Sequence, residues 1–299
     1  MKVKNYNNRL VIDVDNAKDG IIQIIPLADV HLGNENFDLT YFKAVVDYIE
    51  QTDNALFLLN GDLIENTIVG RVPASVFNDT ISPINQITMV STYLEPIVAQ
   101  GKCINATLGN HEKRSSKDVG INPMDMIVSN LTKYDEDLPK KYYPSGVFTF
   151  LNIPYHKHGD KRTTHATILL YNQHGTSGGS TLQGAVGKSV QLDKATQDIA
   201  DIVIRSHTHK AYAIPVKHLR ANYNSYDIYE DKGWLVSNGA FINYWNGYGQ
   251  MAGYEIQDNS TPIITIQVNR KRKGKIEYVD KQINVEMKSK DWFLEQVRK

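Results

Sequence analysis

The stretch GIIQIIPLADVHLG (20–33) decides the class of fold. Its run of apolar, largely β-branched residues is typical of a strand buried in a sheet, and polar residues follow only where the run ends. Asp29 and His31 stand at that end, and side chains at alternate positions of an extended segment point the same way. A carboxylate and an imidazole therefore project together from the end of a buried strand.

Four more apolar runs also end in residues that can bind a metal ion. They are NALFLLNGD (54–62) with Asp62, KCINATLGNH (102–111) with Asn110 and His111, ATILLYNQHG (166–175) with His174, and ADIVIRSHTH (200–209) with His207 and His209. Open α/β sheets present their ligand-binding crevice at the carboxyl ends of the strands. Oxygen and imidazole donors without a thiolate suit manganese, iron or zinc. The pattern therefore predicts a metal site.

Helical patterns alternate with these strands. The apolar stripe from Leu39 to Ile49 keeps helical spacing, and Ser82–Pro83 and Asn122–Pro123 each place a capping residue before a proline at a helix start. Further expected elements are strands at 146–153 and 233–241, a helix around 189–199, a hairpin over 262–279 that turns near Lys273–Gly274, and a terminal helix from Asp291. One α/β domain over residues 1–299 with two layers of sheet accounts for this order.

The composition is that of an ordinary globular protein, and its 33 basic and 33 acidic residues cancel. This balance gives no long-range attraction for nucleic acid, although a local basic groove would suffice. The single cysteine, Cys103, excludes an intramolecular disulfide and fits a reducing compartment. The N-terminal segment MKVKNYNNRL lacks the apolar region of a signal peptide, and no apolar run approaches the roughly 20 residues of a transmembrane helix. We therefore expect a cytoplasmic protein that does not contact a membrane.

The order D-x-H, G-D, G-N-H, H, H-x-H, each block after an apolar strand, resembles the calcineurin-like metallophosphoesterase superfamily. The resemblance covers about residues 21–245 and leaves a C-terminal hairpin and short helix at 260–299. It implies a four-layer α/β/β/α sandwich, in which two mixed sheets are flanked by helices. The segment GDLIE (61–65) is most similar to the SbcD- and Mre11-like nuclease and phosphodiesterase branches.

The resemblance further implies two divalent metal ions. The expected ligands of the first are Asp29, His31, Asp62 and His209, and those of the second are Asp62, Asn110, His174 and His207. Asp62 suits the bridging place because a carboxylate has two anionic oxygens. His111 would assist the leaving oxygen, which makes Asp62 and His111 the expected catalytic residues. Manganese is the expected metal, with iron, zinc and nickel as alternatives.

The chemistry that the family implies is hydrolysis of a phosphoester by a hydroxide that bridges the two ions. The sequence departs from the family pattern at Ser206, where a glycine is usual, and at Ala240 in VSNGAF (236–241), where a serine is usual. Asn66 stands where phosphoprotein phosphatases carry a phosphate-binding arginine, and this disfavours that branch.

The leading hypothesis is a phosphodiesterase that acts on DNA, RNA or nucleotides. Arg114, Tyr244 and Trp245 are the expected substrate contacts, since a guanidinium binds phosphate and aromatic rings stack on bases. Tyr248 belongs to the same aromatic segment, and core packing is an equal alternative for it and its neighbours. The basic run NRKRKGK (269–275) would contact a nucleic-acid backbone or form a solvated turn.

Two other functions remain open from the sequence. A phosphomonoesterase or small cyclic-nucleotide phosphodiesterase fits the balanced charge better than a nuclease does. An inactive scaffold protein that retains the fold would require a damaged ligand set, and Ser206 is the one departure within it. The oligomeric state is open, a homodimer included.

Several other polar segments have plainer explanations. His156 and His158 form another H-x-H between two strands, where a hairpin loop is expected, and His165 and His218 have no partner pattern. The glycine-rich segment 174–189 is either a mobile lid or a flexible loop.

Overall fold

The computed structural model of the protein describes most of the chain. The described residues are 1–15, 17, 20–67, 81–156, 163–176, 181–222, 226–245, 250, 255–256, 259–273 and 276–298. Of the residues named above, His158, Tyr248 and Gly274 lie outside them.

Strands and helices alternate in the first half of the chain, and strands dominate the second. In chain order the elements are β1 (Lys2–Tyr6), β2 (Arg9–Asp13), β3 (Ile21–Leu27), α1 (Leu39–Gln51), β4 (Ala55–Asn60), α2 (Pro83–Ala99), β5 (Cys103–Thr107), α3 (Asn110–Val119), α4 (Pro123–Leu131), the short 3-10 helix η1 (Leu138–Lys141), β6 (Tyr142–Tyr143), β7 (Val147–His156), β8 (Thr163–Gln173), α5 (Leu182–Ala195), β9 (Ile202–Arg205), β10 (Tyr212–Asn222), β11 (Asp227–Ser237), β12 (Ser260–Lys273), β13 (Ile276–Ser289) and α7 (Lys290–Val297).

The strands form two mixed sheets. The six-stranded sheet has the order β13-β12-β3-β4-β5-β6, and the seven-stranded sheet has the order β1-β2-β7-β8-β9-β11-β10. β3, β4 and β5 run parallel, with α1 and α2 in the connections between them, and every residue of β4 is buried. In the other sheet β8 and β9 are parallel to each other. The carboxyl ends of each parallel set therefore meet at one edge of their sheet.

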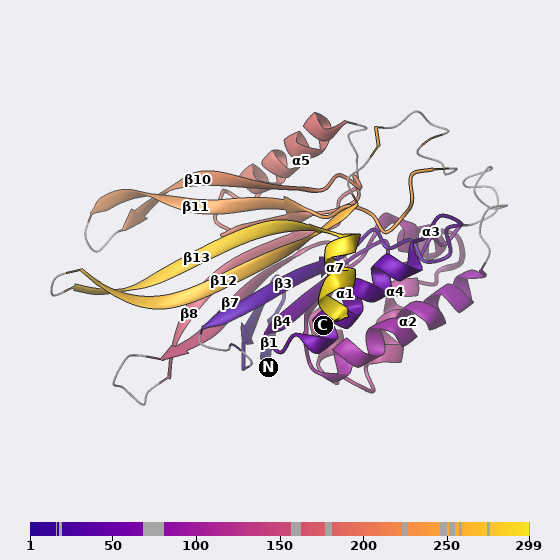
Figure 1. Ribbon diagram of the computed structural model, residues 1–299, viewed down its shortest axis with the longest axis horizontal. Coiled ribbons are helices and arrows are strands. Elements are labelled where there is room, and N and C mark those ends of the chain that lie inside the picture. The colour runs from indigo at the N-terminus through magenta and orange to yellow at the C-terminus, as the bar shows by residue number, and fades with distance from the viewer. Residues whose placement is uncertain are drawn as a thin grey trace.

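Three hydrophobic clusters separate four layers. Ile24 and Leu58 face the second sheet and pack in one cluster with its Leu170. On the opposite face of the six-stranded sheet, Leu27 and Phe57 pack with residues of α1, α2 and α4. A third, small cluster joins the far face of the seven-stranded sheet to α5. Figure 1 shows α5 on one side of the strands, apart from α1, α2 and α4. The predicted arrangement of two mixed sheets flanked by helices is confirmed.

The predicted elements are present, but several differ in extent. The strand expected at 233–241 covers 227–237, the hairpin expected at 262–279 covers 260–289, and the helix expected around 189–199 covers 182–195. β1, β2, β10 and α3 were not predicted, because their residues lack a continuous apolar run. Most residues of β1 are exposed. Within the described part of the chain, no helix combines the length and the apolarity needed to cross a bilayer.

A buried lysine fixes the end of α1 against β5. The Lys102 ammonium donates hydrogen bonds to the carbonyl oxygens of Ile49 at 2.6 Å, Glu50 at 3.0 Å and Thr52 at 3.0 Å. The last carbonyls of a helix have no partner within the helix, so another group must satisfy them. Lys102 does this from the residue that precedes β5, and it thereby fixes α1 relative to the sheet.

Lys102→Met should destabilise the protein. Methionine fills a similar volume but donates no hydrogen bond, which leaves buried carbonyl oxygens without their partner at a cost of about 1–3 kcal/mol in the free energy of unfolding. Urea denaturation followed by circular dichroism measures the change. Lys43→Met, at an exposed position of α1, is the matched control and should stay within about 0.5 kcal/mol of the unaltered protein. Equal stability of the two variants would contradict the capping role.

Candidate metal centre

The expected ligands all lie just beyond the carboxyl ends of five strands. Asp29 and His31 follow β3, Asp62 follows β4, Asn110 and His111 follow β5, His174 follows β8, and His207 and His209 follow β9. Three of these strands belong to one sheet and two to the other. The site therefore lies where the ends of the two sheets meet.

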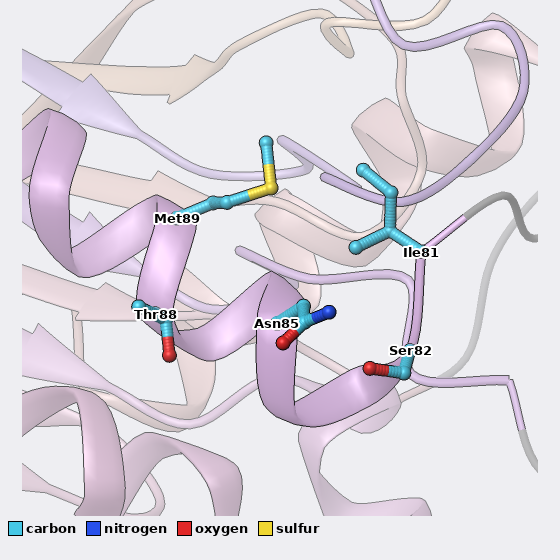
Figure 2. Close-up of a pocket in the computed structure, with 5 residues that line it drawn as sticks. All are labelled: Ile81, Ser82, Asn85, Thr88 and Met89. Carbon is cyan, nitrogen blue, oxygen red and sulfur yellow. The ribbon is translucent and has the colours of Figure 1, made fainter.

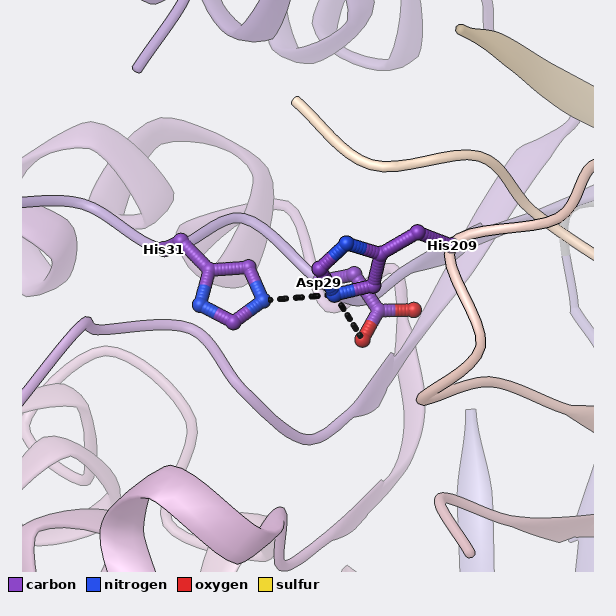
Figure 3. Close-up of side chains that lie close together, drawn as sticks. All are labelled: Asp29, His31 and His209. Carbon is purple, nitrogen blue, oxygen red and sulfur yellow. Dashed lines mark hydrogen bonds and ion pairs between the residues drawn. The ribbon is translucent and has the colours of Figure 1, made fainter. Parts of the chain in front are cut away.

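Asp29, His31 and His209 form the first group (Figure 3). The Nε2 atoms of the two imidazoles are 3.0 Å apart, and Nε2 of His209 is 3.6 Å from Oδ1 of Asp29. Asp29 and His31 are fully buried, whereas a third of the His209 side chain is exposed. The three side chains thus direct their donor atoms to one point from two different strands.

Asp62, His174 and His207 form the second group, with Asn110 beside it. Nε2 of His174 lies 3.0 Å from Oδ2 of Asp62 and 3.0 Å from Oδ1 of Asn110. The other ring nitrogen of His174 donates to the carbonyl oxygen of Asn60 at 2.7 Å. That hydrogen bond fixes the ring so that Nε2 faces the carboxylate and the amide oxygen.

Asp62 belongs to both halves of the site. Its carboxylate lies within 4.8 Å of donor atoms of His174 and His207, and also of His31 and His111. Oδ2 of Asp62 is 4.0 Å from Nε2 of His31 in the first group and 3.0 Å from Nε2 of His174 in the second. The Asp62 carboxylate therefore lies within reach of donor atoms from both groups.

The donor set fits two divalent cations. Two carboxylates and several imidazoles are buried side by side, and burial raises the pKa of Asp29 to about 6, with the charge on neighbouring Asp62 adding to the effect. Buried carboxylates need a cationic partner, and carboxylate, amide and imidazole donors suit first-row divalent ions. Nε2 of His31 and Nε2 of His209 also face each other at a separation that a shared ion would satisfy.

The backbone at the ligands is held in an uncommon conformation. Positive φ angles occur at Asp29 (51°), His31 (52°), Asp62 (51°), His207 (77°) and His209 (56°). Residues other than glycine rarely adopt such angles, and where they do the surrounding structure must hold them. Their concentration at the expected ligands indicates that packing has preset the directions of these side chains.

Two glycines allow the loops of the site to approach each other. A Cβ atom at Gly109 would lie 2.1 Å from the Asp62 nitrogen, and one at Gly61 would lie 2.5 Å from Cα of Gly109. Gly61 also has a φ of 81°, which favours glycine. A larger residue at either position would push apart the two loops that carry Asp62 and Asn110.

Glu112, which was not among the predicted site residues, secures the same two loops. Its buried carboxylate accepts hydrogen bonds from the backbone N–H groups of Asp62 (3.0 Å), Leu63 (2.7 Å) and Gly109 (3.1 Å). Burial raises the pKa of Glu112 to about 7. Its place in the first turn of α3, from which it reaches back to the residue before the helix, is a signal that the sequence offered.

A buried polar network joins the two sheets beneath the site. Asn172 of β8 accepts a hydrogen bond from Asn105 of β5 at 2.8 Å and donates one to Asn60 of β4 at 3.1 Å. Asn60 in turn donates to the hydroxyl of Ser206 at 2.7 Å. Ser206 also donates to Asn238 at 3.1 Å and has no positive φ, so serine fits this place without strain.

His111 lies beside His31 and Asp62 and is paired with Arg114. Its Nδ1 is 2.7 Å from the carbonyl oxygen of Glu65, which only accepts, and its Nε2 is 2.8 Å from the Arg114 guanidinium, which only donates. The ring is therefore neutral, with its proton on Nδ1. Burial lowers the pKa of His111 to about 4, which also favours the neutral ring.

Glu65 was also missed by the sequence analysis. Oε2 of Glu65 is 3.1 Å from Nδ1 of His31 and accepts a hydrogen bond from Asn34 at 3.2 Å. Burial by itself would raise the pKa of Glu65, but the hydrogen bond and the charge of His31 lower it to about 2. Its position in GDLIE, directly after the strand that supplies Asp62, was the available signal.

Asn66 has a structural place. It is fully buried, its side chain donates to the His111 carbonyl at 2.7 Å, and it accepts from the Ser115 hydroxyl at 2.9 Å. These hydrogen bonds tie the loop after β4 to α3. Asn66 is therefore engaged within the protein, whereas Arg114 from the same helix has a guanidinium beside the site.

The predicted aromatic contacts lie on the segment that leaves the site. The N–H of Phe241 donates to the carbonyl of Asp29 at 3.0 Å, and the chain then reaches Tyr244 and Trp245, whose rings pack edge to face. Trp245 is 63% exposed, so it does not pack into the core. Arg114 is thus in contact with the site residues, and the aromatic pair lies further along an adjoining segment.

The structure also shows where the glycine-rich segment and three other histidines lie. Of the glycine-rich segment 174–189, residues 177–180 lie outside the described part, and 182–189 are the first half of α5, so this part is not a loop. His156 ends β7, which pairs with β8 as a hairpin. His165 is exposed, and Nε2 of His218 lies 3.0 Å from Asp193.

A separate groove runs along the start of α2 (Figure 2). It has a volume of about 420 Å³ and is lined by Ile81, Ser82, Asn85, Thr88 and Met89. None of these five side chains carries a carboxylate or an imidazole, so they lack the chemistry found at the strand ends.

The sequence matches one family model, described as calcineurin-like phosphoesterase, over residues 22–211, more than half of the chain. No curated protein matches it significantly. A conserved uncharacterised protein of Streptococcus pneumoniae, described as a predicted phosphoesterase, has 13% identity and a TM-score of 0.32 over 88% of this chain and 98% of that one. A Thermotoga maritima protein has 10% identity and a TM-score of 0.33 over 90% and 99% of the two chains. A protein of unknown function from Aquifex aeolicus has 12% identity and a TM-score of 0.28 over 63% and 80%.

The metal-free protein should lose stability as the pH rises from about 6.5 to 9. Burial by itself lowers the pKa of His174, but the charge of Asp62 and a hydrogen bond to it raise the pKa from 6.5 to about 9. A group whose pKa is raised on folding contributes its full stability when the pH is below its pKa in the unfolded chain. This contribution is lost as the pH rises through its pKa in the folded protein. Thermal melting in a chelator across this range measures the loss.

Manganese should reverse this dependence on pH. Metal binding requires the deprotonated imidazole, so the gain in melting temperature with saturating manganese should grow as the pH rises. A metal-free melting temperature that stays constant or increases between these pH values would contradict the assignment of His174.

Proposed function

The chain belongs to the calcineurin-like phosphoesterase family, and from that premise we propose that this metal-dependent phosphoesterase hydrolyses phosphodiester bonds in nucleic acids or nucleotides. The observation that carries the proposal is the position of the Asp62 carboxylate between two groups of buried donors. We propose manganese as the metal in both sites, because the donors are carboxylate, amide and imidazole without a thiolate.

The chain's residues divide between two ion sites. Asp29, His31 and His209 would hold one ion, Asn110, His174 and His207 would hold the other, and Asp62 would contact both. Bound there, two divalent ions lower the pKa of a water molecule and neutralise charge on the phosphoryl oxygens during in-line attack. The protein's own part is to direct these side chains before the ions arrive, through its strained backbone and buried hydrogen bonds.

Arg114 is the proposed contact for a phosphoryl oxygen. Its guanidinium stays charged and presents several N–H donors in one plane, which matches the geometry of phosphate. It lies beside His111, and its side chain is one-fifth exposed, so a substrate can reach it. Asn66, at the position where phosphoprotein phosphatases have their arginine, is buried and hydrogen-bonded within the protein.

His111 is the proposed proton donor to the leaving oxygen. In the resting protein its Nε2 accepts a hydrogen bond from Arg114 and carries no proton. An anionic phosphoryl group would attract the guanidinium and raise the pKa of His111, because an opposite charge favours the protonated ring. Nε2 would then carry the proton that an alkoxide leaving group requires.

The aromatic pair supports a substrate that contains bases. Trp245 is largely exposed and packs against Tyr244, and bases stack on such rings without regard to sequence. The balanced charge of the chain favours a second candidate, a phosphomonoesterase or small cyclic-nucleotide phosphodiesterase. An inactive scaffold is disfavoured, because every expected ligand is present and gathered at the site.

In manganese, the protein should hydrolyse bis(p-nitrophenyl) phosphate faster than p-nitrophenyl phosphate. Asp62→Ala should abolish the activity because both ion sites lose a ligand, and His111→Ala should slow it by about 100-fold or more because the proton donor is lost. Release of p-nitrophenol under matched conditions gives all the rates. Lys43→Met, a substitution away from the site, controls for differences in protein preparation.

The outcomes separate the candidates. A preference for the diester leads to DNA and RNA of defined length as the next substrates. A preference for the monoester makes the second candidate the better one. Activity that survives Asp62→Ala, or no cleavage of the diester or of DNA in manganese, would contradict the proposal.

Trp245→Ala should weaken binding of a single-stranded oligonucleotide. Stacking of one base is worth about 1–3 kcal/mol, so KM should rise by about 5- to 150-fold while a substrate without bases, methyl p-nitrophenyl phosphate, is unaffected. Tyr229→Ala, which removes an exposed ring from β11, is the matched control. An unchanged KM for the oligonucleotide would show that the aromatic pair does not contact substrate.

A further inference from the structure

We propose that Glu65 is a positioning residue that fixes the imidazole of His31 for the first metal ion. This inference rests on the proposed function, since it assigns a role within the same two-ion site. Glu65 touches no expected position of the substrate or the ions; it acts through His31.

The two carboxylate oxygens of Glu65 have different neighbours, and Oε1 lies 3.4 Å from Nδ1 of His111 and 3.7 Å from the Arg114 guanidinium. Oε2 lies 3.1 Å from Nδ1 of His31, on the side of the ring opposite the metal-facing Nε2. Both side chains are at least nine-tenths buried, so water does not compete for this hydrogen bond. A carboxylate can only accept, and Nδ1 must therefore be the donor.

The consequence is a fixed direction for the metal-binding nitrogen. A metal ion binds the neutral ring, and with the proton on Nδ1 the lone pair of that form is at Nε2, which points toward His209 and Asp29. Metal-bound histidines commonly donate their other N–H group to a carboxylate, and this sets both the tautomer and the orientation of the ring. The Glu65–His31 pair has that geometry.

Glu65 is itself held in place from several sides. Its N–H donates to the carbonyl of Leu32 at 3.0 Å, and Leu32 forms a parallel bridge with Ile64. The side chain of Asn34 donates to the same Oε2 that receives His31. The loop after β4 and the loop after β3 are thus linked by both main chain and side chains, and the carboxylate has little freedom to turn away.

The main chain of Glu65 forms other hydrogen bonds, which a side-chain substitution does not remove. Its carbonyl oxygen accepts hydrogen bonds from Nδ1 of His111 at 2.7 Å and from Arg114 at 3.1 Å. A side-chain substitution leaves this carbonyl in place. Glu65→Ala therefore removes the hydrogen bond to His31 and the longer carboxylate contacts with His111 and Arg114, while it retains the carbonyl acceptor for the last two residues.

The chain offers a closely matched control. Asp193 forms a second buried carboxylate–histidine pair, in which Oδ2 lies 3.0 Å from Nε2 of His218. Its side chain is 8% exposed, against 7% for Glu65. Asp193 lies on α5 and His218 on β10, and neither belongs to the two donor groups of the site. Loss of a buried carboxylate–histidine bond is therefore common to both alanine variants. Asp193 and His218 belong, with Asp198, to a separate group of possible metal donors, so only Glu65→Ala affects the two donor groups of the site.

The experiment is a calorimetric titration of the metal-free full-length protein with manganese chloride. The unaltered protein should bind two ions. Glu65→Ala should bind one of them about 10- to 100-fold more weakly and keep the other, because removal of a carboxylate behind a ligating histidine has effects of this size. Asp193→Ala should bind both ions as the unaltered protein does. Glu65→Gln, whose amide oxygen still accepts from Nδ1, should regain most of the lost affinity.

A spectroscopic readout separates positioning from general destabilisation. In the diamagnetic zinc-loaded protein, the Nδ1–H proton of His31 should give a protected nitrogen-15-coupled signal, assigned by its absence in His31→Gln. That signal should persist in Glu65→Gln and Asp193→Ala. It should be lost to exchange in Glu65→Ala, even where circular dichroism shows a native fold.

The alternative results are distinct. Unchanged affinity for both ions in Glu65→Ala would overturn the role of Glu65, and so would an equal loss in Asp193→Ala. If Glu65→Ala does not fold, loss of the His31 signal in folded Glu65→Gln would overturn it too. An unaltered protein that binds no manganese would instead overturn the proposed function, on which this role depends.

Discussion

The buried carboxylate of Asp62 is the constraint on which the site depends. Its backbone N–H is held by Glu112, its φ is positive, and the neighbouring Gly109 leaves room for it where a Cβ atom would not fit. A carboxylate in this position, with other carboxylate and imidazole groups around it, is costly to bury without cations. The loops on both sides of Asp62 therefore have the arrangement expected around an ion site.

The two-sheet architecture is what brings the donors together. Parallel strands of one sheet supply Asp29, Asp62 and Asn110. The other sheet supplies the histidines that follow β8 and β9. Neither sheet could complete the site alone, so their relative position must be fixed. The buried hydrogen bonds among Asn60, Asn105 and Asn172 do this directly beneath the donors, because a polar network in a core is satisfied in only one alignment.

The sequence revealed most of the sandwich and the polar residues that gather at the strand ends, because both leave local signals. β3, β4 and β5 are short apolar runs that stop at polar residues, and α2 and α4 begin with a capping residue and proline. β10 and the first half of β11 left no such signal, and that half of β11 is largely exposed. Glu65 and Glu112 were missed because their roles consist of hydrogen bonds to groups that are distant in sequence or in the main chain. The resting state of His111 depends likewise on Arg114, which sequence spacing alone cannot show.

The central claim is that Asp62 joins two ion sites, and anomalous diffraction from crystals grown with manganese tests it most directly. Two anomalous peaks about 3.5–4 Å apart are expected, with a carboxylate oxygen of Asp62 in contact with each. His31 and His209 should lie at one peak, and His174 and His207 at the other. A single peak, or two peaks of which only one contacts Asp62, would contradict the account.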